Sequence, residues 1–206
     1  MFEQIFKAQL ADITSDSRQI EKLWKEIEVQ YSKSGRFYHN LSHLDNLTVS
    51  LTPVFDKILD WQTILFSIAY HDIVYNPIKK NNEEISAELA NKRLLELGVS
   101  KFQRDRCFSQ IMATKTHSFS NDSDTNYFTD ADLSILGSVG DEYIQYAQLI
   151  RKEYKYLPDF VYKPGRQKVL RRFLEMQQIF KTDYFYEHFE HQARINLDNE
   201  LKLLQS

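Results

Sequence analysis

The sequence predicts an all-α protein that folds as a single globular helical bundle. Apolar residues recur at helical spacing along most of the chain, and no segment shows a convincing alternation of apolar and polar residues. Only five glycines and four prolines occur in 206 residues. Sheet-rich folds need many turn residues, so this scarcity favours long helices with few connections. A chain of this length can bury one full core, so we expect one domain over residues 1–206.

Turn and capping residues divide this pattern into nine helices. Pro77 ends the third, Gly98 closes the fourth, and Pro164 suits the first position of the eighth. The polar stretch 118–125 is expected to be a loop. The helices are expected at about residues 2–31 (with a break near 14–17), 40–59, 61–74, 83–97, 101–115, 130–136, 142–156, 164–180 and 184–204.

Charge and cysteine content exclude several classes of protein. The net charge of −3 is too close to neutral for general nucleic-acid binding. The single cysteine, Cys107, rules out an intrachain disulfide and a cysteine zinc site. The first nineteen residues lack the apolar core of a signal peptide, and no stretch of about eighteen apolar residues would form a transmembrane helix. We therefore expect a cytoplasmic protein with no membrane partner.

Two polar residues interrupt the apolar face of the third helix. Leu65 and Ile68 lie on this face, and Asp72 follows Ile68 by four residues, with His71 beside it. An unpaired carboxylate in such a place would cost several kcal/mol. Asp72 must therefore be paired, protonated or bound to a metal, although a His-Asp pair alone also occurs by chance.

A second carboxylate shows the same conflict. Asp132 lies four residues after Phe128 and three before Ile135, inside an apolar face. One bivalent cation would explain both conflicts. The alternative is a helix capped by Thr129, with Asp132 in its first turn and stabilised by the helix dipole. Asp130 is expected to be a first-turn carboxylate of this kind.

The histidines complete the candidate donor set. His39 and His43 share a helix face if that helix begins by residue 39, and they either share a metal or act as one ligand and one supporting neighbour. Imidazole and carboxylate donors suit Zn, Mn, Fe or Ni, whereas Mg prefers more oxygen. His43 and His117 have the ordinary alternative of packed or surface residues. His188 and His191 are expected to be solvated or packing residues of the last helix.

The ordered series His39, His71-Asp72 and Asp132 resembles the H…HD…D signature of the HD superfamily of metal-dependent phosphohydrolases. Five segments strengthen the resemblance to its small bacterial group: RFYHNLSHL, AYHDIVYNP, NNEEISA, ATKTH and FTDADLSILG. They run from about residue 36 to residue 137. Weaker similarity continues through IRKEYKYLPD, GRQKVLRRFL and ARINLDNE, so the resemblance covers most of the chain.

The resemblance implies an HD-type helical fold with one divalent metal ion held by His39, His71, Asp72 and Asp132. The family pattern selects Asp132 rather than Asp130, in agreement with the apolar pattern. The metal-binding core would span about residues 36–137, and the helices of residues 142–204 would pack on it.

One position departs from the family. Some nucleotidase members carry a catalytic acid three residues after the HD aspartate, where this chain has Tyr75. The nearest acids are Glu83 and Glu84, beyond the loop 76–82. We take Glu84 as the candidate catalytic acid, and its role is open.

The implied reaction is hydrolysis of a phosphoester in a small, nucleotide-like molecule by a metal-activated water. Asp72 would be a ligand and an acceptor of the water's proton. Four other residues have candidate roles: Lys115 neutralises phosphate charge, His117 acts as an acid or holds a second metal ion, His43 faces the substrate or that second ion, and Arg36 clamps a phosphate. The alternative for Arg36 is an ordinary surface cation. The basic residues of the segment 163–172 are a candidate substrate contact at a helix N-terminus, and the alternative is a solvated helix face.

Two other functions compete with the phosphohydrolase. Some HD-fold proteins are di-iron oxygenases, which need more histidine and carboxylate ligands. A non-enzymatic module would instead keep a structural metal and bind a nucleotide or another ligand, which Tyr75 favours. The sequence leaves open the substrate, the metal's identity, the metal count and the oligomeric state.

Overall fold

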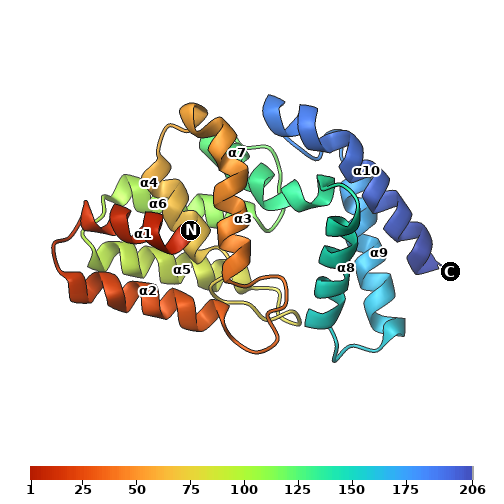
Figure 1. Cartoon of the computed structure of the whole chain (residues 1–206), viewed down its shortest axis with the longest axis horizontal. Helices are drawn as coiled ribbons and strands as arrows, with labels where there is room; N and C mark the ends of the chain where they lie inside the picture. The colour runs from red at the N-terminus through yellow and green to blue at the C-terminus, as the bar shows by residue number, and fades with distance from the viewer. Residues whose placement is uncertain (206) are drawn as a thin grey trace. The chain divides into compact units, whose positions relative to one another are not determined.

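The protein is described by a computed structural model of residues 1–205, and the regular structure in this range is entirely helical (Figure 1). This confirms the predicted all-α class. The helices are α1 (Phe2–Ala11), α2 (Ser17–Tyr31), α3 (Leu41–Leu51), η1 (Thr52–Lys57), α4 (Trp61–Tyr70), α5 (Asn82–Glu96), α6 (Lys101–Ala113), α7 (Ser123–Leu133), η2 (Ser134–Gly137), α8 (Asp141–Glu153), α9 (Asp159–Glu175) and α10 (Asp183–Gln205), where η marks a 3-10 helix. No helix in this range is both long and apolar enough to cross a membrane.

The chain divides into two compact units, Met1–Thr129 and Asp130–Ser206. The division falls inside α7, which is one continuous helix from Ser123 to Leu133.

Helix α4 is the centre of the first unit. It packs against α1, α3, α5 and α6, and every residue from Thr63 to Tyr70 is buried. A helix that is apolar all round belongs in a core. Its N-terminus is capped by Asp60, whose carboxylate accepts hydrogen bonds from the backbone N–H and the hydroxyl of Thr63. The C-terminal end of this buried helix therefore delivers His71 and Asp72.

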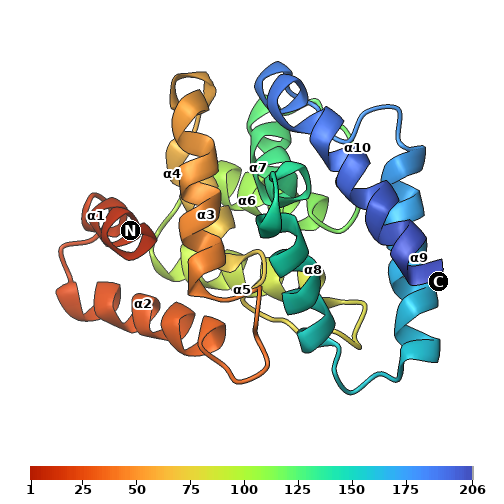
Figure 2. The ribbon, with the colours of Figure 1, turned by 45° about the vertical axis from the view of Figure 1, so that its right-hand side comes forward.

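In the second unit, α10 is the helix against which other elements pack. It packs against α9 and η2, and Figure 2 shows α9 and α10 side by side. Gly137 in η2 lies so close to α10 that a Cβ atom there would be 2.6 Å from the Cβ atom of Phe189. The side-chain amide of Asn196 donates hydrogen bonds to the carbonyls of Leu136 and Ser138, each at 2.8 Å. These bonds satisfy carbonyls on both sides of the close approach.

Two predicted helix starts are wrong, and a third is confirmed to within a residue. α3 begins at Leu41, close to the expected residue 40, because the Asn40 side chain accepts from the N–H of Ser42 and caps the helix, so His39 lies before it and does not share its face with His43. α7 begins at Ser123, inside the predicted loop. Pro164 lies within α9, whose N-cap is Pro158. The predicted break near residues 14–17 is confirmed, since Asp16 caps α2.

The early start of α7 changes the interpretation of its acids. The stretch that looked like a loop supplies the helix with a polar first turn, in which the Asp122 carboxylate accepts from the Thr125 hydroxyl. Thr129 is therefore not an N-cap, and its hydroxyl donates to the carbonyl of Thr125 one turn earlier. Asp130 and Asp132 are not in the first turn of α7, so the dipole explanation for Asp132 is wrong.

We predict that Gly137→Ala destabilises the protein by about 1–3 kcal/mol, because the new methyl group would overlap with Phe189. Gly165→Ala is the matched control: it lies in α9 and a Cβ atom there meets nothing within 4 Å. Removing glycine from a helix should stabilise by about 0.5–1 kcal/mol. Urea unfolding followed by circular dichroism measures both changes. Equal effects of the two substitutions would contradict the close approach at Gly137.

Candidate metal centre

Two histidines from different helices face each other in the first unit. His43 is buried in the first turn of α3, and His71 directly follows the last residue of α4. Their Nε2 atoms are 3.1 Å apart. The Nδ1 atom of His71 lies 3.0 Å from the carbonyl oxygen of Ile68, so we assign the proton of this ring to Nδ1. The Nε2 lone pair of His71 therefore points toward His43, as in metal-binding histidines oriented by a backbone carbonyl.

Asp72 and His39 extend the group of donors. The Oδ2 atom of Asp72 lies 3.3 Å from Nε2 of His71 and 3.8 Å from Nε2 of His39. The Asp72 side chain is 18% exposed and that of His39 20%, so this side of the group is open to solvent. Three imidazoles and one carboxylate of the first unit thus gather within one small region.

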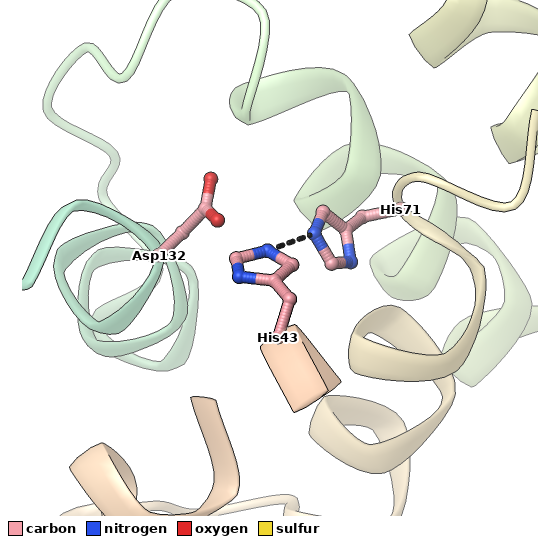
Figure 3. Close-up of side chains that lie close together, drawn as sticks. All are labelled: His43, His71 and Asp132. Carbon is pink, nitrogen blue, oxygen red and sulfur yellow. Dashed lines mark hydrogen bonds between the residues drawn. The ribbon is translucent and has the colours of Figure 1, made fainter. Parts of the chain in front are cut away.

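Asp132 adds a second carboxylate. One ligand atom each of His43, His71 and Asp132 lie within 4.8 Å of one another, and Figure 3 shows the Asp132 carboxylate turned toward the two imidazoles. Helix geometry accounts for this position: Asp132 is one turn after Phe128 in α7, and the Phe128 ring centroid is 5.7 Å from that of His71. The cluster therefore joins two of the four predicted ligands, His71 and Asp132, with His43, while Asp72 lies beside His71 and His39 lies beside Asp72.

Arg36 braces the backbone that carries these residues. Its guanidinium donates to the carbonyls of His39 at 3.0 Å, Asp72 at 2.7 Å and Ile73 at 2.9 Å. It also lies over the ring of Tyr31, 4.8 Å from the centroid. Arg36 therefore joins the His39 segment to the His71–Asp72 segment. Arg36 is therefore more than a surface cation, and its expected role as a phosphate clamp stays a prediction.

The position of the expected acid is occupied by an aromatic contact. The Tyr75 ring centroid lies 4.4 Å from that of His39, at an interplanar angle of 31°. The Tyr31 hydroxyl accepts a hydrogen bond from the backbone N–H of Asp72 at 3.2 Å. Two tyrosines therefore help to orient His39 and Asp72.

Glu84 and Lys115, both candidates for catalysis, form an ion pair. The Lys115 ammonium also donates to the carbonyl of Lys80 at 2.9 Å. The hydrogen bond from Lys115 lowers the pKa of Glu84. The other carboxylate oxygen of Glu84, Oε2, is buried and has no hydrogen-bond partner among the described residues. Oε2 of Glu84 can therefore accept a hydrogen bond from a second polar group.

The start of α5 ties this pair to the chain that follows Asp72. The backbone N–H of Val74 donates to the Ser86 hydroxyl at 3.1 Å, and that of Asn76 donates to the Asn82 side chain at 3.1 Å. Glu84 lies between Asn82 and Ser86 in the first turn of α5. The Glu84–Lys115 pair is therefore held beside the segment that carries Tyr75.

The remaining acids and histidines have other surroundings. Asp130 is fully buried and accepts hydrogen bonds from the Lys181 ammonium at 2.8 Å and from the N–H and hydroxyl of Thr182, each at 2.8 Å. It is a structural carboxylate of the second unit. His117 follows α6 with a backbone φ of 51°, which is uncommon for a residue other than glycine. His188 stacks on Tyr184 within α10.

The basic segment 163–172 also proves to be partly structural. Arg166 is buried and binds Glu200 of α10 through two hydrogen bonds of 2.8 and 2.9 Å. Lys168 and Arg171 are exposed on α9, as a solvated face would be. The segment lies within α9 rather than at its start, so the expected helix N-terminus is wrong.

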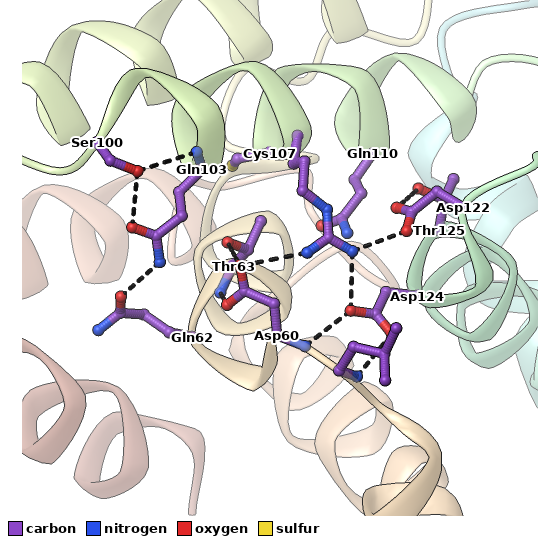
Figure 4. Close-up of polar contacts among 12 residues, drawn as sticks. Asp60, Gln62, Thr63, Ser100, Gln103, Cys107, Gln110, Asp122, Asp124 and Thr125 are labelled. Atoms are coloured by element: carbon purple, nitrogen blue, oxygen red, sulfur yellow. Dashed lines mark hydrogen bonds and ion pairs between the residues drawn. The ribbon is translucent and has the colours of Figure 1, made fainter.

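An ion cluster that the sequence did not reveal positions the ligand-bearing helices (Figure 4). Arg106 of α6 contacts Asp60 at 3.3 Å, Asp122 at 2.7 Å and Asp124 at 3.0 Å. Asp124 is fully buried and accepts the backbone N–H groups of Leu59 and Asp60, both at 2.8 Å. Burial opposes ionisation of Asp122, yet the hydrogen bonds from Thr125 and Arg106 lower its pKa.

This Arg106 cluster joins the N-terminal ends of α4 and α7. His71 follows α4 by one residue, and Asp132 is the second-last residue of α7. At about 1.5 Å of rise per residue, both lie roughly 12–17 Å along their helices from the cluster. The cluster therefore supports the helix that ends beside His71 and the first turn of the helix that carries Asp132.

Comparison with known proteins adds no relative. No protein-family model matches the chain, and neither the search of curated proteins nor that of solved structures finds a match. The interpretation of the site therefore rests on its residues and their geometry.

We predict that Cys107 does not react with iodoacetamide at pH 8.5 in the native protein. The thiol is fully buried between α6 and α4, where the Ser67 hydroxyl donates to its sulfur at 3.4 Å, and burial raises its pKa to about 12. The reactive thiolate is therefore scarce at this pH. Because the folded pKa is raised, the unfolded state is favoured progressively from about pH 9 to pH 12.

Mass spectrometry after timed labelling measures the reaction, with the guanidinium-unfolded protein as the control that should label fully. Stoichiometric labelling of the folded protein within minutes would contradict the burial of Cys107.

Proposed function

We propose that this protein is a metal-dependent phosphohydrolase that cleaves a phosphoester in a small, nucleotide-like substrate. The observation that carries the proposal is the convergence of histidine nitrogens and carboxylate oxygens from three separate stretches of the chain. The resemblance of the series His39, His71-Asp72 and Asp132 to the HD signature supplies the reaction class. The single buried cysteine also fits the reducing cytoplasm, where we place the protein.

The donor set fits a divalent transition metal ion. The proposed ligands are His39, His71, Asp72 and Asp132, and the short distance to His71 adds His43 to them. Imidazole nitrogen and carboxylate oxygen suit Zn, Mn, Fe or Ni better than Mg. When bound, such an ion would polarise a phosphoryl oxygen and lower the pKa of a water molecule. The contact between Nδ1 of His71 and the Ile68 carbonyl orients the ring so that its Nε2 atom faces His43.

The chain itself would supply proton transfer and charge neutralisation. The partly exposed Asp72 carboxylate can accept a proton, because Arg36 and Tyr31 hold its backbone and leave its side chain facing the histidines. Lys115 would bind the negative phosphoryl group, and Glu84 would assist the leaving group as an acid when Lys115 turns to the substrate. His117 is a further candidate for that acid.

A non-enzymatic module that binds a small phosphorylated ligand is the second candidate. Its specific support is the packing of Tyr75 on His39, where an acid would be expected in a nucleotidase. In that case the metal ion would be structural. A di-iron oxygenase has less support, because one cluster of two imidazoles and a carboxylate is found among the described residues and a second iron would need further ligands.

We predict that Asp132→Asn lowers the affinity for Zn²⁺ or Mn²⁺ by about tenfold or more, because a neutral amide is a poorer ligand than a carboxylate. Asp130→Asn should retain the metal but lose about 3 kcal/mol of stability, because the buried Lys181 ammonium loses its charged partner. Elemental analysis after equilibrium dialysis and urea unfolding measure the two effects. Loss of metal in Asp130→Asn with retention in Asp132→Asn would reverse our assignment.

We predict that Lys115→Gln raises KM for phosphoester substrates about tenfold or more and leaves metal content unchanged, because it removes a cation from the site. Lys79→Gln, in the neighbouring exposed loop, is the matched control and should change nothing. A panel of nucleoside monophosphates with phosphate release as the readout provides the test. Metal-loaded protein that binds panel members but turns none over would favour the binding module and contradict the enzyme.

A further inference from the structure

The second unit contains a cleft that is separate from every residue of the candidate metal centre. Its volume is about 590 Å³, and residues of α8, α9 and α10 line it. Pockets for small molecules usually measure about 300–1,000 Å³ and are mostly apolar. The apolar wall consists mainly of Ile144, Ala147, Ile195, Leu203 and Leu204. The cleft thus has the size and lining of a ligand site.

The wall leaves large apolar side chains open to solvent. Ile144 is 54% exposed, Ile195 40% and Leu203 72%. Scattered exposed apolar residues are ordinary, but these three line one concave surface. Covering them with an apolar molecule would remove hydrocarbon from water, which is the main source of affinity in such pockets.

A buried polar network holds the three helices apart beneath this wall. Glu200 of α10 accepts two hydrogen bonds from Arg166 of α9 and one from the hydroxyl of Tyr143 of α8. The Arg166 and Glu200 side chains are 8% and 11% exposed. A satisfied network of this kind fixes the spacing of the helices that contribute to it. The cleft is therefore formed by the fold and does not depend on an occupant to open it.

Three of the four charged residues that line the cleft, Arg151, Asp159 and Glu200, are held in ion pairs. Glu200 is paired with Arg166, and Asp159 is paired with Arg151 at 2.7 Å. Lys163 also lines the cleft, and no ion pair joins its ammonium to any carboxylate in residues 1–205. One positive charge therefore remains uncompensated beside an apolar wall.

We propose that this cleft binds an amphipathic monoanion, a medium-chain carboxylate, whose hydrocarbon chain lies against Ile144, Ile195 and Leu203 and whose head group pairs with Lys163. The volume and apolar wall favour a hydrocarbon body, and the uncompensated ammonium selects a negative head group. This inference is independent of the proposed phosphohydrolase activity, because the cleft and the candidate metal centre share no residue.

The test uses decanoate as the probe, with decylammonium and decanol as controls of equal chain length, in isothermal titration calorimetry on the full chain. Decanoate should bind at one site per chain and more tightly than either control. Ile195→Glu places a carboxylate on a partly exposed wall position, so the fold should persist while decanoate binding weakens at least tenfold. Circular dichroism checks the fold of each variant.

Lys163→Gln should weaken decanoate binding about three- to fivefold and leave decanol binding unchanged, as expected for a partly exposed ion pair. Lys168→Gln, which removes the same charge from an exposed position of α9 outside the cleft, should have no effect. Equal affinities for decanoate and decylammonium would overturn the assignment of an anion. No binding of decanoate, or a dimer in light scattering that Ile195→Glu dissociates, would overturn the ligand site altogether.

Discussion

The ion cluster around Arg106 is the interaction on which the candidate centre depends. One guanidinium contacts three carboxylates, from the cap of α4 and from the start of α7. Asp124 is fully buried, so removal of Arg106 would leave a charge without compensation in the core. The cluster anchors the N-terminal end of α4 and the start of α7 to one guanidinium. His71 directly follows the other end of α4, so the cluster supports the helix that delivers this donor.

Contacts with backbone carbonyls orient the histidine and aspartate side chains of the candidate centre. Ile68 fixes the ring of His71 through a carbonyl, and Arg36 joins the carbonyls of His39 and Asp72. These contacts involve backbone carbonyls and Nδ1 of His71, so Nε2 of His71 stays directed at His43 and Asp72. A group of side chains oriented by its surroundings in this way is preorganised. Asp130, two residues before Asp132, instead accepts hydrogen bonds from Lys181 and Thr182 and supports the second unit.

The sequence predicted the helical class and most helices correctly, since long amphipathic patterns dominate over local ambiguity. The prediction of where helices begin failed where polar side chains at a helix start were mistaken for a loop. Asp122 and Asp124 lie in a polar stretch typical of a loop, yet α7 begins in this stretch and both carboxylates accept hydrogen bonds from Arg106. Whether His39 shares a helix face with His43 was open, and the Asn40 cap places His39 before the helix. The buried Arg166–Glu200 pair was also invisible, because its partners are 34 residues apart in different helices.

The sequence by itself determined that the chain is helical and that His71, Asp72 and Asp132 conflict with an apolar pattern, because periodicity and burial cost are properties of local sequence. It also supplied the order of residues on which the HD resemblance rests. Only the tertiary structure decided that His43 lies 3.1 Å from His71, that Arg36 braces the site and that Lys115 pairs with Glu84. Such contacts join helices that are distant in sequence, and their geometry follows from how the core packs rather than from spacing along the chain.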